Sequence, residues 1–217
     1  SKYVLLVPID SIAGFFALLV ICVLANLLWS TSSVSSELEG KTWSYVAARP
    51  GGRLSLMIGK YVVSVGWTLL VTTFAISASI AVQAAIQPND EELKYWLVFE
   101  GLAILACFAY AAVFTLLGAI FHGRAMVAAI VYTGVFELVI GSLAANVKYL
   151  TIRAPLVHLG AYALLPEEML ETPEVAAFLG DRNTLASIAS IVVLTIVTFT
   201  ASLVVARYRE YLTTKEV

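Results

Sequence analysis

Glu137 is the residue whose place in the sequence most needs a chemical explanation. It lies in the middle of VYTGVFELVIGSLAANV, an apolar stretch long enough to cross a bilayer. A carboxyl group at the centre of a membrane helix costs roughly 2.5–3.5 kcal/mol on insertion scales, so it is usually sheltered inside a bundle or faces a water-filled path. Two roles stay open: the side chain bonds backbone or hydroxyl groups of neighbouring segments, or it lines a transport path.

Two further polar residues lie inside apolar runs and are weaker candidates for the same path. Glu100 is only a few residues from one end of its run, where water and lipid headgroups reach a carboxylate. Asn26 lies near the cytoplasmic end of its run, and a hydrogen bond between helices is the simpler explanation of its presence there. We keep both beside Glu137 as embedded polar groups that a substrate could meet.

Catalytic chemistry finds little support in the sequence. The only histidines are His122 and His158, and neither GxSxG nor HExxH occurs. Cys22 and Cys107 fall inside apolar runs without metal-ligand spacing, so they are interpreted as small membrane-helix residues. We therefore expect no enzyme activity, no catalytic residue, no metal site and no cofactor bound by this chain.

The composition predicts an integral membrane protein. Hydrophobic residues make up 60% of the chain and charged residues 13%, and the mean hydropathy is +0.91. The lipid bilayer is thus an expected partner. A net charge of −2 supplies no basic footprint for nucleic acid, which is excluded as a partner.

An all-α bundle of membrane helices is the expected fold, in one transmembrane domain over residues 1–217. Five apolar runs are each long enough to cross a bilayer with about 20 residues, and none shows the alternation of a barrel strand. They are approximately residues 3–29, 61–87, 96–121, 126–147 and 185–206.

The distribution of lysine and arginine predicts the orientation, because loops rich in these residues stay cytoplasmic. One side collects eight of them: Lys41, Arg49, Arg53, Lys60, Arg124, Arg207, Arg209 and Lys215. The other side collects five: Lys2, Lys94, Lys148, Arg153 and Arg182. We place the amino-terminal end outside and the carboxyl terminus in the cytoplasm. An odd number of spans that starts outside suggests that an earlier crossing is missing from this sequence.

The cytoplasmic segment 30–60 carries the densest signal. A helix is expected over residues 36–48, since serine followed by acidic residues suits a helix start. The run Pro50-Gly51-Gly52 then ends it. Such a compact polar helix between two spans fits a docking element for a cytoplasmic partner, although a merely solvated loop explains it equally well.

This segment resembles the one after the second span in ABC-2 type transporter permeases. The matching features are an acidic residue, a Gly-Thr pair interrupted here by Lys41, an Arg-Pro and the later Gly59-Lys60. The stretch 132–141 with Glu137 is similar to the fifth span of that family. The resemblance implies a coupling helix over residues 37–50 that contacts a separate ATPase subunit, formed by Glu37, Glu39, Gly40, Lys41, Thr42, Tyr45, Arg49 and Pro50.

The same resemblance implies the number of spans, the oligomeric state, the direction of transport and the membrane. The complete subunit would have six spans, form a homodimer with a second permease copy, and export a substrate across a bacterial inner membrane. ATP and Mg²⁺ would be bound by the partner ATPase, because this sequence has no GxxxxGK[ST]. The alternatives from the residues alone are a secondary transporter or channel that uses Glu137, and a membrane scaffold for a cytoplasmic complex.

The outer segment 148–184 is longer than ordinary connections and is expected to contain helices. Its apolar stretch LVHLGAYAL is too short to span, and suits an interfacial or re-entrant segment. In ABC-2 permeases this position holds short helices that close the outer mouth. The resemblance therefore makes gate candidates of Pro155, His158, Tyr162 and Pro166.

Overall fold

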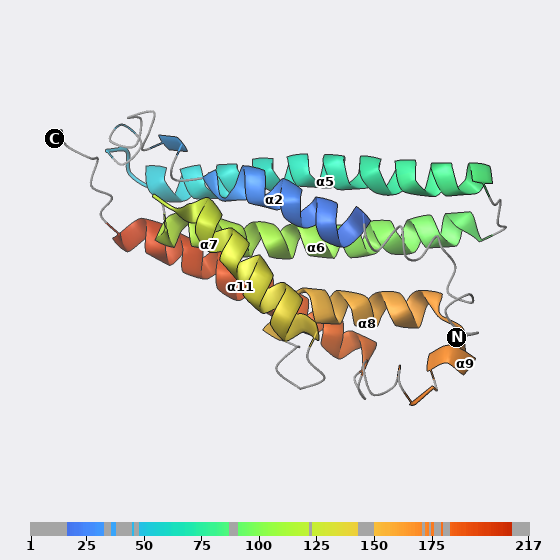
Figure 1. Ribbon diagram of the computed structural model, residues 1–217. Coiled ribbons are helices and arrows are strands. Elements are labelled where there is room, and N and C mark those ends of the chain that lie inside the picture. Colours follow the sequence, from blue (N-terminus) through green and yellow to red (C-terminus); the bar gives the residue numbers. More distant parts are fainter. Residues whose placement is uncertain are drawn as a thin grey trace.

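The computed structural model describes residues 17–32, 36–37, 45, 48–86, 91–121, 123–142, 150–170, 172–173, 175, 179 and 183–209. Every regular element within these ranges is a helix, which confirms the all-α class. The elements form a bundle of long, roughly aligned helices with shorter ones laid against it (Figure 1).

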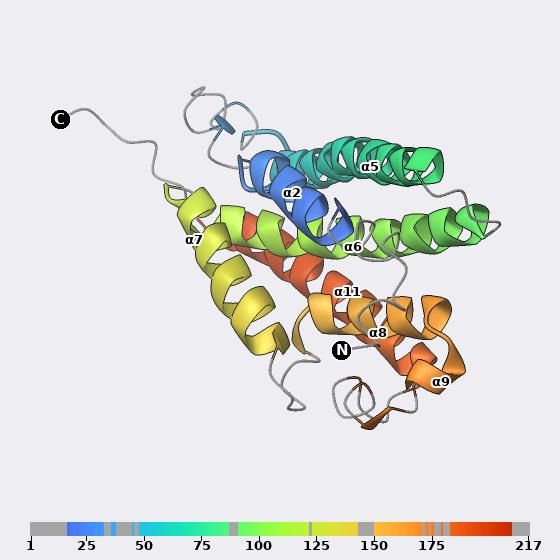
Figure 2. The same ribbon diagram turned by 45° about the vertical axis from the view of Figure 1, so that its right-hand side comes forward.

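Within the described ranges, three helices are long and apolar enough to cross a membrane: α5 (Gly52–Ile86), α6 (Glu92–Ile120) and α11 (Thr184–Tyr208). The hydrocarbon core of a bilayer is about 30 Å thick, a distance that roughly 20 helical residues cover. α5 and α6 run antiparallel to each other, and α11 packs along α6 on another side (Figure 2). These three helices correspond to the predicted runs 61–87, 96–121 and 185–206.

α6 is the central helix of the bundle. Within its most apolar window 67% of the residues are buried, against 11% for α5 and 11% for α11. Small residues dominate its middle, where Ala103, Ala106, Ala109 and Ala111 are all buried. Short side chains let neighbouring helices approach closely, so α2, α5, α8 and α11 all pack on α6.

The outward faces of the other helices are apolar. Phe74 of α5 is 76% exposed, and Val193 of α11 and Val127 of α7 are each 58% exposed. A helix that is apolar on all sides belongs in a large core or in a membrane. The exposed faces are therefore consistent with those of helices in a membrane protein.

Two other predicted runs form shorter helices in the described residues. The first contains the π-helix η2 (Ala17–Ile21) and α2 (Cys22–Ser30), and the fourth contains α7 (Ala125–Tyr132), the π-helix η3 (Thr133–Val139) and the 3-10 helix η4 (Ile140–Ser142). Residues 3–16 and 143–147 of these runs lie outside the described part. The structure thus gives three helices of spanning length, and the count of five spans stays a prediction.

α5 begins earlier than its apolar run suggested. Gly51 has a φ of 74°, in the left-handed region that glycine adopts without strain, and the helix starts at the next residue. No proline follows before residue 61 and the helix continues through Gly59, so the turns from Gly52 to Lys60 are helical and extend α5 beyond its apolar stretch. Residues 52–60 therefore belong to a long helix rather than to a cytoplasmic loop.

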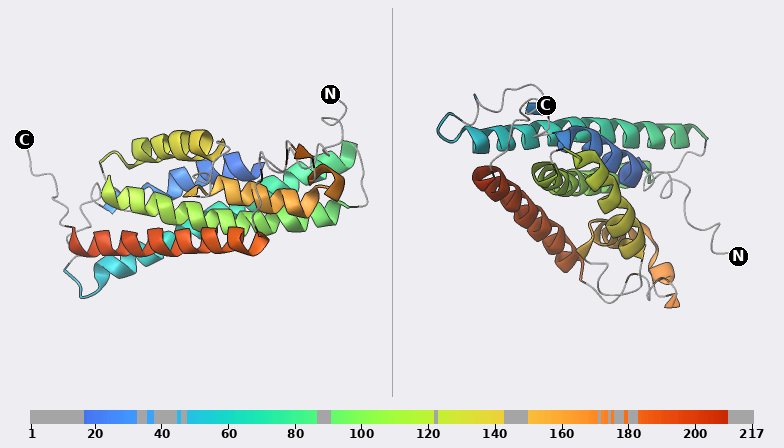
Figure 3. Two further views of the ribbon diagram at one scale, coloured as in Figure 1. Left: turned by 90° about the horizontal axis from the view of Figure 1, so that it is seen from below. Right: turned by 60° about the vertical axis from the view of Figure 1, so that its left-hand side comes forward.

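The predicted outer segment contains α8 (Arg153–Leu164) and α9 (Glu167–Leu170). α8 starts beside the end of η3, about midway along α5 and α6, and runs toward the end of the bundle where α6 begins (Figures 1 and 3). It packs against α6 and α11 and buries Leu156, Leu159 and Leu164. α8 is therefore a short helix packed on the bundle, and its interfacial or re-entrant placement stays a prediction.

Candidate functional site

Glu137 is held by hydrogen bonds from four directions. Its Oε2 accepts from the hydroxyl of Tyr110 at 3.0 Å and from the backbone N–H of Arg153 at 2.9 Å. Its Oε1 accepts from the hydroxyl of Tyr132 at 3.1 Å and from the backbone N–H of Ile152 at 3.1 Å. The residue is only 2% exposed. Each carboxylate oxygen therefore accepts two hydrogen bonds from groups inside the bundle.

The two backbone donors belong to the start of α8. The first N–H groups of a helix have no partner within the helix, and a negative charge there is favourable because of the helix dipole. Thr151 adds a further cap, since its Oγ1 accepts from the N–H of Ala154 at 3.3 Å. Glu137 and Thr151 together satisfy the amino-terminal end of a helix that starts in the interior of the bundle.

An aromatic cluster surrounds this carboxylate. Tyr132 stacks on Phe136 with ring centroids 5.3 Å apart, and Phe114 meets Tyr132 edge-on at 6.3 Å. Glu137 itself lies in the π-helix η3, whose wider turn changes the direction of side chains relative to an α-helix. The wider turn places the carboxylate toward Tyr110 and α8, and no residue pattern in the sequence indicated it.

Glu100 lies in a poorer polar environment between α5 and α6. Its Oε2 accepts from Thr73 at 2.9 Å, while its buried Oε1 has no hydrogen bond among the described residues. One turn toward the start of α6, the indole N–H of Trp96 donates to Ser77 at 3.0 Å. The two embedded carboxyl groups thus differ: Glu137 is saturated by donors and Glu100 is not.

Asn26 and the two cysteines share a buried polar seam between α2, α5 and α6. The amide of Asn26 donates to the backbone oxygen of Cys22 at 3.0 Å, and Asn26 accepts from Ser30 at 3.2 Å. The hydroxyl oxygens of Ser30 and of Ser64 in α5 lie 3.1 Å apart, within hydrogen-bond distance. The sulfur atoms of Cys22 and Cys107 are 3.4 Å apart. No pattern in the sequence indicated this contact, because 85 residues separate the two cysteines.

The gate candidates gather on α8 and after it. Nδ1 of the buried His158 lies 3.2 Å from the hydroxyl of Ser187 in α11, and its ring packs on Tyr162 at 4.6 Å. Pro155 occupies the first turn of α8, where a missing N–H is tolerated, and Pro166 precedes α9. His158 therefore joins α8 to α11, while Tyr162 is 45% exposed.

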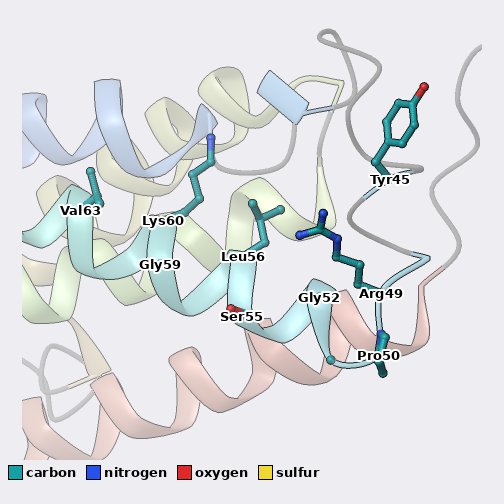
Figure 4. Close-up of a pocket in the computed structure, with 10 residues that line it drawn as sticks. Tyr45, Arg49, Pro50, Gly52, Ser55, Leu56, Gly59, Lys60 and Val63 are labelled. Atoms are coloured by element: carbon teal, nitrogen blue, oxygen red, sulfur yellow. The ribbon is translucent and has the colours of Figure 1, made fainter.

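Another polar corner forms where the chain enters α5. The ammonium group of Lys60 lies 2.9 Å from the carboxylate of Glu37 and donates to Ser36 at 3.0 Å. Both Ser36 and Glu37 are helical. Arg49 and Lys60 lie on either side of Leu56, along a hollow of about 890 Å³ (Figure 4). Its other lining residues are Tyr45, Pro50, Gly51, Gly52, Ser55, Gly59 and Val63.

Arginines tie this corner to the ends of two other helices. Arg53 of α5 donates to the backbone oxygen of Arg207 in α11 at 3.3 Å. Arg209 donates to the carbonyl oxygens of Ala119 and Ile120 at the end of α6. These hydrogen bonds join the start of α5 to the ends of α6 and α11. We call this region the basic corner, and it comprises Glu37, Arg49, Arg53, Lys60 and Arg209.

The structure places only part of the predicted coupling helix. Glu37 pairs with Lys60, Tyr45 is 78% exposed, and Arg49 and Pro50 form the exposed turn before α5. Glu39, Gly40, Lys41 and Thr42 lie outside the described residues. Among those described, no group of three or more His, Cys, Asp or Glu residues is arranged to hold a metal ion.

Comparison with known proteins identifies no relative of this chain. No protein-family model matches the chain, and neither a curated protein nor a solved structure is similar enough to count as a match.

Proposed function

We propose that this chain is the membrane-spanning permease subunit of an ATP-binding cassette transporter of the ABC-2 type. ATP hydrolysis on separate cytoplasmic subunits would drive export of a substrate along the interface of two permease copies. The proposal includes five spans in this chain, the basic corner on the cytoplasmic side, and location in a bacterial inner membrane. It rests on the sequence resemblance and on the geometry of two regions.

The main support is the mechanical link between the polar segment and the bundle. Lys60 lies on the third turn of α5 and holds Glu37 and Ser36 by an ion pair and a hydrogen bond. α5 is the longest described helix and packs along α6. A push on the segment around Glu37 would therefore pass directly into a helix that spans the membrane.

The hollow beside this link suits a protein partner. Its walls combine the cationic Arg49 and Lys60 with the apolar Leu56 and Val63, and Tyr45 stands largely exposed at its rim (Figure 4). Aromatic and arginine side chains are enriched where proteins bind one another. A side chain of the ATPase subunit that enters this hollow would contact both the coupling segment and α5.

The position of α8 supports a gate at the opposite end. It starts at mid-bundle and is fixed there by Glu137, while its other end approaches α9 (Figure 1). His158 and Ser187 connect it to α11, so displacement of α11 would be transmitted to α8. We assign to α8 the role of a plug at the outer mouth.

A secondary transporter or channel based on Glu137 has weaker support. A carboxylate that carries protons or ions must exchange its partners during each cycle, whereas Glu137 accepts four hydrogen bonds from fixed groups. We propose that its role is to position α8. Glu100, which accepts one hydrogen bond within the described part of the chain, from Thr73, is the better embedded contact for a substrate.

Co-purification from native membranes tests the proposed function. The tagged wild-type chain should bring down a protein that contains GxxxxGK[ST], and exchange of charge through Glu39→Arg with Arg49→Glu should release it. Glu92→Arg, a charge change at the start of α6 and the opposite end of the bundle, is the matched control and should retain the ATPase. Unchanged co-purification of the first variant would exclude the coupling segment as the docking element.

A further inference from the structure

Cys22 and Cys107 form a contact that neither the proposed transport cycle nor the membrane anchoring uses. Their sulfur atoms are 3.4 Å apart, and both side chains are fully buried. Both thiols are free. Since Cys22 lies at the start of α2 and Cys107 in the middle of α6, the contact joins a peripheral helix to the central one.

The pair belongs to the main hydrophobic core, but two polar side chains touch its sulfurs. The amide of Asn26 donates to the Cys22 sulfur at 3.6 Å, and the Cys107 thiol donates to the hydroxyl of Thr72 at 3.8 Å. A thiol that reacts with a disulfide must do so as the thiolate. The Asn26 amide can donate to a thiolate at Cys22, and the Thr72 hydroxyl can donate to a thiolate at Cys107 once that thiol has lost its proton.

We propose that Cys22 and Cys107 are an oxidisable dithiol, a modification site whose disulfide would fasten α2 to α6 within the membrane. The reagent that it would take is a small, uncharged disulfide that dissolves in the bilayer. The assignment depends only on the placement of the two sulfurs and is independent of the proposed ATP-driven function.

The reaction would proceed by two exchanges. One cysteine thiolate attacks the S–S bond of the reagent, forms a mixed disulfide and releases the first thiolate of the reagent. The sulfur of the second cysteine then attacks the protein sulfur of that mixed disulfide, so that the Cys22–Cys107 bond forms and the second reagent thiolate leaves. The protein thiols lose two electrons and two protons, and the reagent disulfide gains both as two thiols.

Treatment of the full chain in lipid nanodiscs with a dipyridyl disulfide tests this assignment. The wild type should release two pyridinethione molecules per chain, retain no reagent adduct by intact mass and yield a Cys22–Cys107 cross-linked peptide. Because the chain has only two cysteines, the Cys22→Ser variant should release one molecule and keep one adduct. Oxidation of the wild type should also raise the midpoint of thermal unfolding, and a reductant should reverse this.

A relocated cysteine provides the matched control. Leu24 lies on the same helix but is 54% exposed, so its side chain faces away from α6. The Cys22→Ser/Leu24→Cys variant has the same number of cysteines and should retain adducts without forming an internal bond. Stable adducts on both wild-type cysteines, unreacted thiols after denaturing alkylation, or cross-linked dimers in place of the internal bond would each overturn the proposal.

Discussion

Two polar regions of this molecule differ in how deeply their charged groups are buried and in how many hydrogen bonds those groups make. At the centre of the bundle, the carboxylate of Glu137 is 2% exposed and accepts four hydrogen bonds from fixed donors. At the basic corner, Lys60 and Glu37 form one ion pair with side chains 34% and 18% exposed, beside an open hollow. A saturated buried carboxylate fixes structure, whereas a partly exposed ion pair beside an open hollow can exchange partners.

The difference assigns separate tasks to the two regions. Removal of one partner from a buried, hydrogen-bonded charge leaves unsatisfied groups in a low-dielectric interior, so such a site cannot change cheaply. An ion pair that water partly reaches, such as Lys60–Glu37, contributes about 1 kcal/mol or less and is therefore easily replaced by contacts with another protein. We accordingly expect the Glu137 region to determine stability and the basic corner to determine coupling.

The largest effect on stability is expected from Glu137→Ala. The change leaves two backbone N–H groups and two tyrosine hydroxyls without an acceptor, which should destabilise the bundle by about 3 kcal/mol or more. Unfolding of the purified chain in mixed detergent and SDS measures this difference. Glu137→Gln should lose less, because one acceptor oxygen remains.

Glu100→Ala is the matched control for that prediction. Glu100 is also a carboxyl group inside a candidate span, but the described residues give it one hydrogen bond, from Thr73. Its removal should cost at most about 1.5 kcal/mol. Equal destabilisation by the two alanine variants would show that the hydrogen bonds to Glu137 do not set the stability of this region.

Single hydroxyl deletions should give intermediate effects. Tyr110→Phe removes one donor to Glu137 while the aromatic ring still fills its site, and Tyr110 is only 1% exposed. A loss of about 1.5–3 kcal/mol is expected for a hydrogen bond to a charged group. In a double-mutant cycle, Tyr110→Phe should have little further effect in the Glu137→Ala background. Full additivity of the two changes would contradict the direct contact.

The smallest effect on stability is expected at the basic corner. Glu37→Gln and Lys60→Gln each remove the ion pair, and the free energy of unfolding should change by less than about 1 kcal/mol. The same SDS titration measures it. A loss as large as that of Glu137→Ala would mean that this corner is part of the core structure and would remove the contrast between the two regions.

The sequence revealed the elements better than their contacts. Apolar run lengths predicted the helices that became α5, α6 and α11, because the thickness of a bilayer fixes the length that a span requires. The position of Glu137 within an apolar stretch singled it out, since an embedded carboxyl group always needs partners. Its actual donors could not be predicted, because Ile152 and Arg153 reach it only through the wider turn of η3 and the mid-bundle start of α8.

The same limit applies to the other contacts of the site. Lys60 meets Glu37 across 23 positions of the sequence, and Cys22 meets Cys107 across 85. Apolar periodicity does not specify which faces of two membrane helices meet, because lipid and neighbouring helices are almost equally apolar. The early start of α5 depended on the left-handed conformation of Gly51, which a Pro-Gly-Gly run permits without locating the first helical residue.

Permease-stimulated ATP hydrolysis is the most direct test of the account. The purified chain, reconstituted in nanodiscs with the ATPase subunit that we propose as its partner, should raise the ATP hydrolysis of that subunit several-fold. Glu37→Lys and Lys60→Glu should each abolish the stimulation without unfolding the bundle, and the double charge exchange should restore much of it. Stimulation that is unchanged in both single variants would contradict the claim that the basic corner carries the coupling.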